Sequence, residues 1–188
     1  MTKKVLVTGV AGFIGSQLAH HLQRSGHQVL GCDLVSLEGV SPQAVDPILV
    51  RLRKERLAEL ITGSGIEYVQ LDIGQENAFD QVLTRWQPDT VVHLAAQAGV
   101  RHSMQAPLDF VTPNLVGFAR VLQACHLHQT PRLLYASSSS VYGLRNQVPF
   151  VETDRTDQPQ SFYAATKQAN EAMAYAYQVQ YGMGSIGM

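Results

Sequence analysis

The chain has 188 residues, of which 45% are hydrophobic and 15% charged, and its formal net charge is −1. This composition fits one globular domain with a sizeable core, argues against disorder, and gives no charged footprint for nucleic acid or an anionic membrane surface. No apolar run reaches the ~18 residues of a membrane-spanning helix. Glycines at positions 9, 12 and 15 argue against a secretory signal in the apolar N-terminal stretch. We therefore expect a cytoplasmic protein.

Strand-length apolar runs alternate with helical patterns along the chain. The predicted strands are residues 4–9, 27–33, 66–72, 89–96 and 131–139, and the predicted helices are residues 12–26, 47–65, 78–87, 113–129 and 161–178. Short strands that are apolar on both faces and separated by helices indicate a parallel sheet covered on both sides. With right-handed crossovers, the fold class is a doubly wound, Rossmann-type α/β sheet of at least five strands. Two long loops, residues 33–47 and 141–160, are expected to line a ligand site.

The first predicted strand runs directly into a glycine-rich turn and a helix. Gly9 and Gly12 suit a tight turn and the close approach of a pyrophosphate to the helix N-terminus, and Gly15 allows close packing of helix on sheet. The alternative is a merely tight strand-to-helix turn. The strand–turn–helix context favours dinucleotide binding.

Carboxylates end the second and third predicted strands. Asp33 lies 18 residues beyond Gly15, where it could accept hydrogen bonds from the ribose hydroxyls of the adenosine and repel a 2′-phosphate, which favours NAD over NADP. Asp72 could reach the edge of the adenine. Both could instead serve the loops that follow them.

The cysteines and histidines show no ligand pattern. Cys32 and Cys125 lie in predicted regular segments without CxxC or Cys/His spacing, so we expect small buried apolar residues and no disulfide or zinc site. The seven histidines are interpreted as structural or surface residues, and no metal site is expected.

Tyr163 and Lys167 lie four residues apart on the last predicted helix, so their side chains share one face. The simpler interpretation is packing of the phenol against the lysine stem. A phenol with a pKa near ~10 is a poor base unless a nearby cation stabilises the phenolate, and Lys167 could supply that cation. The serine run that ends the fifth strand should point into the same crevice, where a hydroxyl would complete a proton path. Together these residues form a candidate acid/base device.

The motifs "TGVAGFIG", Asp33, "LDI", "HLAAQAGVR", "PNLVGF", "YASSSSVYG" and "YAATK" together resemble the extended short-chain dehydrogenase/reductases, within the NAD-dependent nucleotide-sugar epimerases and dehydratases. The resemblance covers essentially the whole chain and is strongest to UDP-glucuronate 4-epimerases. It implies that Ser138, Tyr163 and Lys167 are catalytic and that Ser139 and Ser140 face substrate. Arg101 in "AGVRHS" could contact an anionic group of the substrate, and the alternative is a solvated surface residue on a loop. The implied NAD-binding residues are Gly9, Gly12, Phe13, Ile14, Gly15, Asp33, Asp72, Ile73, Leu94, Ala95, Ala96, Asn114, Tyr163 and Lys167.

The resemblance implies C4 epimerisation of a UDP-sugar through a 4-keto intermediate, with UDP-glucuronate favoured. In the related dehydratases an Asp-Glu pair follows the catalytic hydroxyl, whereas Ser139 and Ser140 stand here and cannot do that acid/base work near neutral pH. A nucleotide-sugar dehydratase or decarboxylase and a non-catalytic dinucleotide-binding module remain the alternatives.

Two departures from the family pattern affect these expectations. Pro113 precedes Asn114, where the family more often has a small polar residue, so the helix there could start differently. The further strand and the substrate-binding region of family members are expected to be missing, which makes residues 1–188 the NAD-binding domain. The full-length protein is expected to be a homodimer, and the isolated chain to be inactive and prone to self-association.

Overall fold

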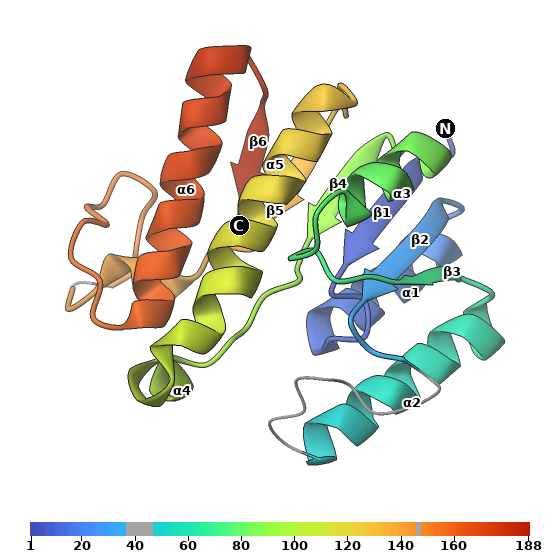
Figure 1. The fold of residues 1–188 in the computed structure, drawn as a ribbon, viewed down its shortest axis with the longest axis horizontal. Coiled ribbons are helices and arrows are strands. Elements are labelled where there is room, and N and C mark those ends of the chain that lie inside the picture. Colours follow the sequence, from blue (N-terminus) through green and yellow to red (C-terminus); the bar gives the residue numbers. More distant parts are fainter. Residues whose placement is uncertain (37–46, 146–147) are drawn as a thin grey trace.

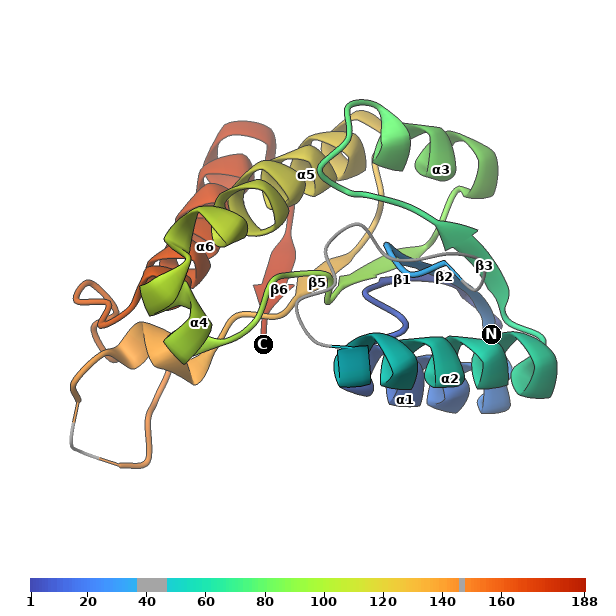
Figure 2. The same ribbon diagram turned by 60° about the horizontal axis from the view of Figure 1, so that its bottom comes forward.

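The computed structural model describes residues 1–36, 47–145 and 148–188, and it places one parallel sheet between two layers of helices (Figures 1 and 2). The strands are β1 (Lys4–Thr8), β2 (Gln28–Asp33), β3 (Glu67–Gln70), β4 (Thr90–His93), β5 (Leu133–Tyr135) and β6 (Ser185–Gly187). Their spatial order is β3-β2-β1-β4-β5-β6, and every neighbouring pair is parallel. The predicted Rossmann-type fold is confirmed, with the order reversing between β1 and β4.

The helices divide between the two faces of the sheet. Helices α1 (Phe13–Arg24) and α2 (Pro47–Ser64) cover one face, and α3 (Ala78–Trp86), α5 (Gly117–Leu127) and α6 (Phe162–Tyr181) cover the other (Figure 2). Val5 and Val7 pack toward the first layer, while Leu6 packs toward the second among residues such as Phe118 and Leu122. This alternation buries β1 on both faces, as its continuous apolar run predicts.

Strand β6 is not among the five predicted strands, although six strands agree with the prediction of at least five. Its residues Ser185, Ile186 and Gly187 pair with Leu133, Leu134 and Tyr135 of β5. The segment carries one large apolar residue between small ones, so its own sequence has no strand signal. Pairing with β5 forms the strand, and the absence of a side chain at Gly187 matters because a Cβ there would lie 2.8 Å from the Tyr135 hydroxyl.

The predicted helix at residues 113–129 begins differently, as Pro113 suggested. A π-helical turn, η2 (Val111–Val116), precedes α5, which begins at Gly117. Proline has no amide hydrogen to donate to the preceding turn, which favours such a wider turn over regular helix. The irregular turn sets the position of the residues that follow β4.

The other sequence predictions concern the cysteines, the two long loops, membrane-spanning helices and metal sites. Cys32 and Cys125 are free and buried, as predicted. Residues 37–46 of the first predicted loop and 146–147 of the second lie outside the described residues. Within the described ranges, no helix is both long and apolar enough to span a bilayer, and no group of three or more His, Cys, Asp or Glu side chains is placed to hold a metal ion.

Candidate active site

The glycine turn joins β1 to α1 and brings the backbone close to the end of β4. Gly9 has φ of +70°, and a Cβ at this position would lie 2.7 Å from the Ala95 amide nitrogen. A Cβ at Gly15 would overlap the Gly9 carbonyl oxygen and lie 2.9 Å from the Val10 Cα. Both positions therefore require glycine, one for its φ and one for close helix–sheet contact.

Helix α1 begins without a side-chain cap in the described chain, because its N-cap residue is Gly12. The side chains of Phe13 and Ile14 are 70% and 65% exposed, so the first turn offers a ligand its backbone amides. Uncapped amides at a helix N-terminus favour an anion, which suits a pyrophosphate.

Asp33 ends β2 and is held by the adjacent backbone. Its Oδ2 accepts a hydrogen bond from the Ala11 amide at 3.0 Å, and its Oδ1 accepts one from the Val35 amide at 3.4 Å. Burial raises the pKa of this carboxyl group, while the Arg53 charge and these backbone amides oppose the rise. A carboxylate has about four acceptor positions, so acceptor capacity remains for two ligand hydroxyls.

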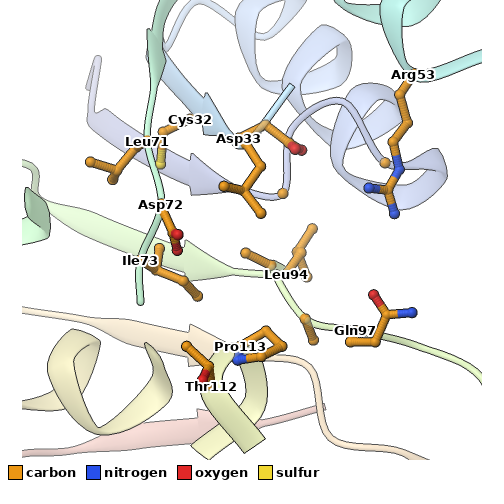
Figure 3. A pocket seen from close by; sticks show the side chains of 15 residues that line it. Cys32, Asp33, Arg53, Leu71, Asp72, Ile73, Leu94, Gln97, Thr112 and Pro113 are labelled. Atoms are coloured by element: carbon orange, nitrogen blue, oxygen red, sulfur yellow. The ribbon is translucent and has the colours of Figure 1, made fainter. Parts of the chain in front are cut away.

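A pocket opens at the carboxyl ends of β1, β2, β3 and β4 (Figure 3). It is bordered by the glycine turn, by the ends of three strands, by Arg53 of α2 and by η2. The lining residues are Gly9, Gly12, Cys32, Asp33, Leu34, Arg53, Leu71, Asp72, Ile73, Leu94, Ala95, Ala96, Gln97, Thr112 and Pro113. The structure thus brings eight of the predicted cofactor residues to one pocket at the topological switch point, where ligands of such sheets bind.

The wall that follows β4 is fixed by a buried threonine. The Thr8 Oγ1 accepts hydrogen bonds from the amides of Leu94 and Ala95, both at 3.1 Å, and lies 2.8 Å from the His93 Nδ1. Burial, and then the Lys167 charge, lower the pKa of His93 to about 3. His93 is therefore a neutral core residue, consistent with its structural interpretation.

Asp72 and Ile73 form the opposite wall. The Asp72 Oδ1 accepts a hydrogen bond from the Gly74 amide at 2.7 Å, which orients the carboxylate. Ile73 is buried against Gly117, where a Cβ would lie 2.9 Å from the Ile73 Cδ1.

Asn114 lies beneath the pocket wall, whereas Thr112 and Pro113 line it. Its Oδ1 accepts a hydrogen bond from the Gln97 amide at 2.8 Å, and its Nδ2 donates to the Gln97 carbonyl at 3.0 Å and to the Thr166 Oγ1 at 3.1 Å. The side chain is buried. Asn114 therefore connects the pocket wall to α6.

Tyr163 and Lys167 lie on one face of α6, as their spacing predicts. The Lys167 Nζ is 5.9 Å from the centroid of the Tyr163 ring and donates a hydrogen bond to the Ala136 carbonyl at 2.8 Å. The Tyr163 amide donates to the buried Ser103 Oγ at 3.1 Å. Burial lowers the pKa of Lys167 from 10.5 to about 8.

The four serines after β5 have different environments. Ser137 donates to a Glu171 carboxylate oxygen of α6. Ser138 caps the 3₁₀ turn η3 (Ser139–Tyr142), and its Oγ accepts hydrogen bonds from the Ser140 amide at 3.2 Å and from the Ser140 hydroxyl at 2.9 Å. With both acceptor positions occupied, the Ser138 proton is left to donate. Ser139 is exposed.

Arg101, a predicted substrate contact, lies exposed on α4 (Val100–Gln105) and does not line the pocket. Conversely, sequence reasoning missed the lining residues Arg53, Gln97 and Thr112 and the supporting residues Thr8 and Ser103. Thr8 and Gln97 lie inside the motifs "TGVAGFIG" and "HLAAQAGVR", but those motifs do not indicate what the two side chains contact. The roles of all five residues follow from tertiary contacts.

The sheet, the glycine turn and the pocket at its switch point define an α/β protein of the Rossmann type. Residues 5–188 match the model of the NAD dependent epimerase/dehydratase family, and the chain belongs to that family.

Among curated proteins, the chain is 42% identical over 185 residues to "UDP-glucuronate 4-epimerase 3" of Arabidopsis thaliana, a match that covers 98% of this chain and 41% of the relative. It is 39% identical to "Protein CapI" of Staphylococcus aureus, with 98% of this chain and 52% of the relative covered. The chain thus spans about half the length of the curated relatives it matches.

The fold is also similar to solved epimerase structures. The UDP-glucuronic acid 4-epimerase of Bacillus cereus, in complex with UDP-glucuronic acid and NAD, matches with a TM-score of 0.82 and 30% identity, over 98% of this chain and 55% of that one. The UDP-glucose 4-epimerase of Thermus thermophilus, in complex with NAD, matches with a TM-score of 0.78 and 28% identity, over 98% of this chain and 53% of that one.

Proposed function

We propose that this chain is the NAD-binding part of an enzyme that inverts C4 of a UDP-sugar, with UDP-glucuronate as the favoured substrate. The observation that carries the proposal is the buried Lys167 beside Tyr163 on α6, where the Lys167 Nζ donates to the Ala136 carbonyl just after β5. The same helix is joined to the pocket wall by the hydrogen bond from Asn114 to the Thr166 hydroxyl.

The residues present fit a dinucleotide. A Cβ at Gly12 would lie 3.0 Å from the Gly9 carbonyl oxygen, so this turn is a close-fitting backbone surface that a pyrophosphate could approach. Asp33 would accept hydrogen bonds from the adenosine ribose, which favours NAD over NADP. The amides of Phe13 and Ile14 would meet the pyrophosphate, while Asp72 and Ile73 would flank the adenine. Bound NAD would supply hydride acceptance and return.

The protein's own residues would handle the proton. Tyr163, as phenolate, would take the proton of the C4 hydroxyl, and the Lys167 ammonium would stabilise the phenolate charge. Ser138 would keep its proton and donate a hydrogen bond to the sugar oxygen at C4. When the sugar, as a 4-keto species, presents its opposite face, Tyr163 would return the proton to that oxygen.

Epimerisation is favoured over water elimination by the serine run. Elimination needs a carboxyl group beside C5 and C6, whereas Ser139 and Ser140 offer only hydroxyl groups with no titration near neutral pH. Proteins named as UDP-glucuronate 4-epimerases among the relatives support the choice of substrate. Arg101 would contact an anionic group of that substrate, and the full-length enzyme would be a homodimer.

The test is Tyr163→Phe in a protein extended to the full length of its relatives. Turnover of UDP-glucuronate should fall to near zero while NAD stays bound, because the change removes the proton acceptor and little packing. Tyr175→Phe is the matched control, since Tyr175 lies on the same helix and is 67% exposed. Full activity of Tyr163→Phe would refute the proposal.

A further inference from the structure

Arg53 is a charged residue of the pocket that the proposed chemistry does not use. It lies on α2 and lines the pocket with Asp33, and Figure 3 shows its guanidinium directed toward the space that Asp33 and Gln97 also border. Within the described chain, no hydrogen bond or ion pair engages this guanidinium. Arg53 therefore faces the adenosine end of the pocket with its donors available.

The charged side chains around Arg53 indicate which ligand groups could bind there. Among the described lining residues, the charged side chains are Asp33, Asp72 and Arg53. The two carboxylates are already oriented by backbone amides. Arg53 is close enough to Asp33 to lower the pKa of that carboxyl group, yet the two side chains form no ion pair. A ligand group can therefore lie between a carboxylate acceptor and a guanidinium donor.

We propose that Arg53 binds the 2′ position of the adenosine ribose, opposite Asp33. This inference rests on the proposed cofactor binding and deepens it. Asp33 accepts the hydrogen of a ribose hydroxyl, and Arg53 donates to the 2′ oxygen. Where the 2′ position carries a phosphate, the same guanidinium forms charge-assisted hydrogen bonds and offsets the repulsion from Asp33. Arg53 thus reduces the preference for NAD over NADP that Asp33 sets.

Two other arginines of α2 have different environments, which provides a control. Arg51 forms an exposed i,i+4 ion pair with Glu55 at 3.6 Å, and Arg56 lies over the Phe13 ring at 5.8 Å. Neither lines the pocket. Arg51→Ala removes the same charge from the same helix, so it measures the long-range effect of net charge on an anionic ligand.

The experiment is calorimetric titration of the chain, Arg53→Ala, Arg53→Lys and Arg51→Ala with NAD and with NADP. Arg53→Ala should weaken NAD binding about twofold to tenfold, as expected for the loss of one hydrogen bond to an uncharged hydroxyl oxygen, and NADP binding about tenfold to a hundredfold. Arg53→Lys should recover part of the NADP affinity because it keeps the charge. Arg51→Ala should leave the ratio of the two affinities unchanged.

Other outcomes would overturn the inference. Equal weakening of both cofactors by Arg53→Ala would place Arg53 on a part that the two share, and an equal change of the ratio in Arg51→Ala would reduce the effect to net charge. In either case, and whenever Arg53→Ala leaves the ratio of the NAD and NADP affinities unchanged while the unaltered chain binds NAD, only this inference is overturned. Absence of NAD binding by the unaltered chain would overturn the proposed function and this inference with it.

Discussion

The change that Lys167→Met makes to the free energy of unfolding should be more favourable to the fold at pH 7 than at about pH 10. Lys167 is 4% exposed, and burial lowers its pKa from 10.5 to about 8. The unfolded chain therefore holds this proton more tightly than the folded chain. Below about pH 8 the buried charge lowers the free energy of unfolding, and that loss is recovered as the pH rises from about 8 toward 10.5. Since one pKa unit corresponds to about 1.4 kcal/mol, the recovery between pH 7 and 10 is about 2–3 kcal/mol.

The assay is urea denaturation of the chain and of Lys167→Met at both pH values. The variant loses the hydrogen bond to the Ala136 carbonyl, which costs about 1 kcal/mol at either pH and cancels in the comparison. Titration of the other groups, such as the thiols of Cys32 and Cys125, is common to both proteins. Lys4→Met is the control, because Lys4 is exposed and its removal uncovers no buried charge. A stability difference between Lys167→Met and the chain that is the same at pH 7 and 10 would refute the reasoning.

Three further predictions concern the turn and the chain as a whole. Gly15→Ala should lower the free energy of unfolding by about 2–3 kcal/mol in chemical denaturation, because its Cβ would overlap the Gly9 carbonyl; unchanged stability would contradict this. Gly12→Val should abolish NAD binding in calorimetry at a smaller cost in stability, since its Cβ would lie 3.0 Å from the same oxygen, and retained binding would count against the pyrophosphate assignment. Residues 1–188 alone should bind NAD but show no conversion of UDP-glucuronate, because substrate positioning supplies several kcal/mol or more of catalysis. They should also self-associate in light scattering. A monodisperse monomer of residues 1–188 that converts UDP-glucuronate steadily would contradict this last prediction.

Much of the fold could be predicted because its signals are local. A continuous apolar run such as Val5 to Val7 indicates a strand buried on both faces, and the observed burial follows it. The glycine turn is equally local, since Gly9 needs positive φ whatever surrounds it. The position of Asp33 in the pocket could be predicted because it ends a strand of a parallel sheet.

Other features could not be predicted because they depend on partners distant in sequence. Strand β6 has one large apolar residue, Ile186, and forms by pairing with β5. Arg53 lies within a charged helical segment, and only the packing of α2 against α1 brings it to the pocket. The resemblance singled out Ser138 in the serine run, but the local sequence does not show how the neighbouring hydroxyls differ. In the structure Ser137 donates to Glu171, whereas Ser138 accepts from Ser140.

Asn114 shows how this fold can couple cofactor and chemistry through one buried side chain. Its amide group satisfies both backbone polar groups of Gln97, which lines the pocket, and donates to the Thr166 hydroxyl on α6. Thr166 in turn donates to the Tyr163 carbonyl at 2.7 Å, within the same helical turn as the proposed base. Because a buried amide left without these partners would cost ~1–3 kcal/mol, the pocket wall and the tyrosine helix cannot shift independently without that penalty. The position of Tyr163 relative to the pocket is therefore set by the same hydrogen bonds that shape the pocket wall, and not by α6 alone.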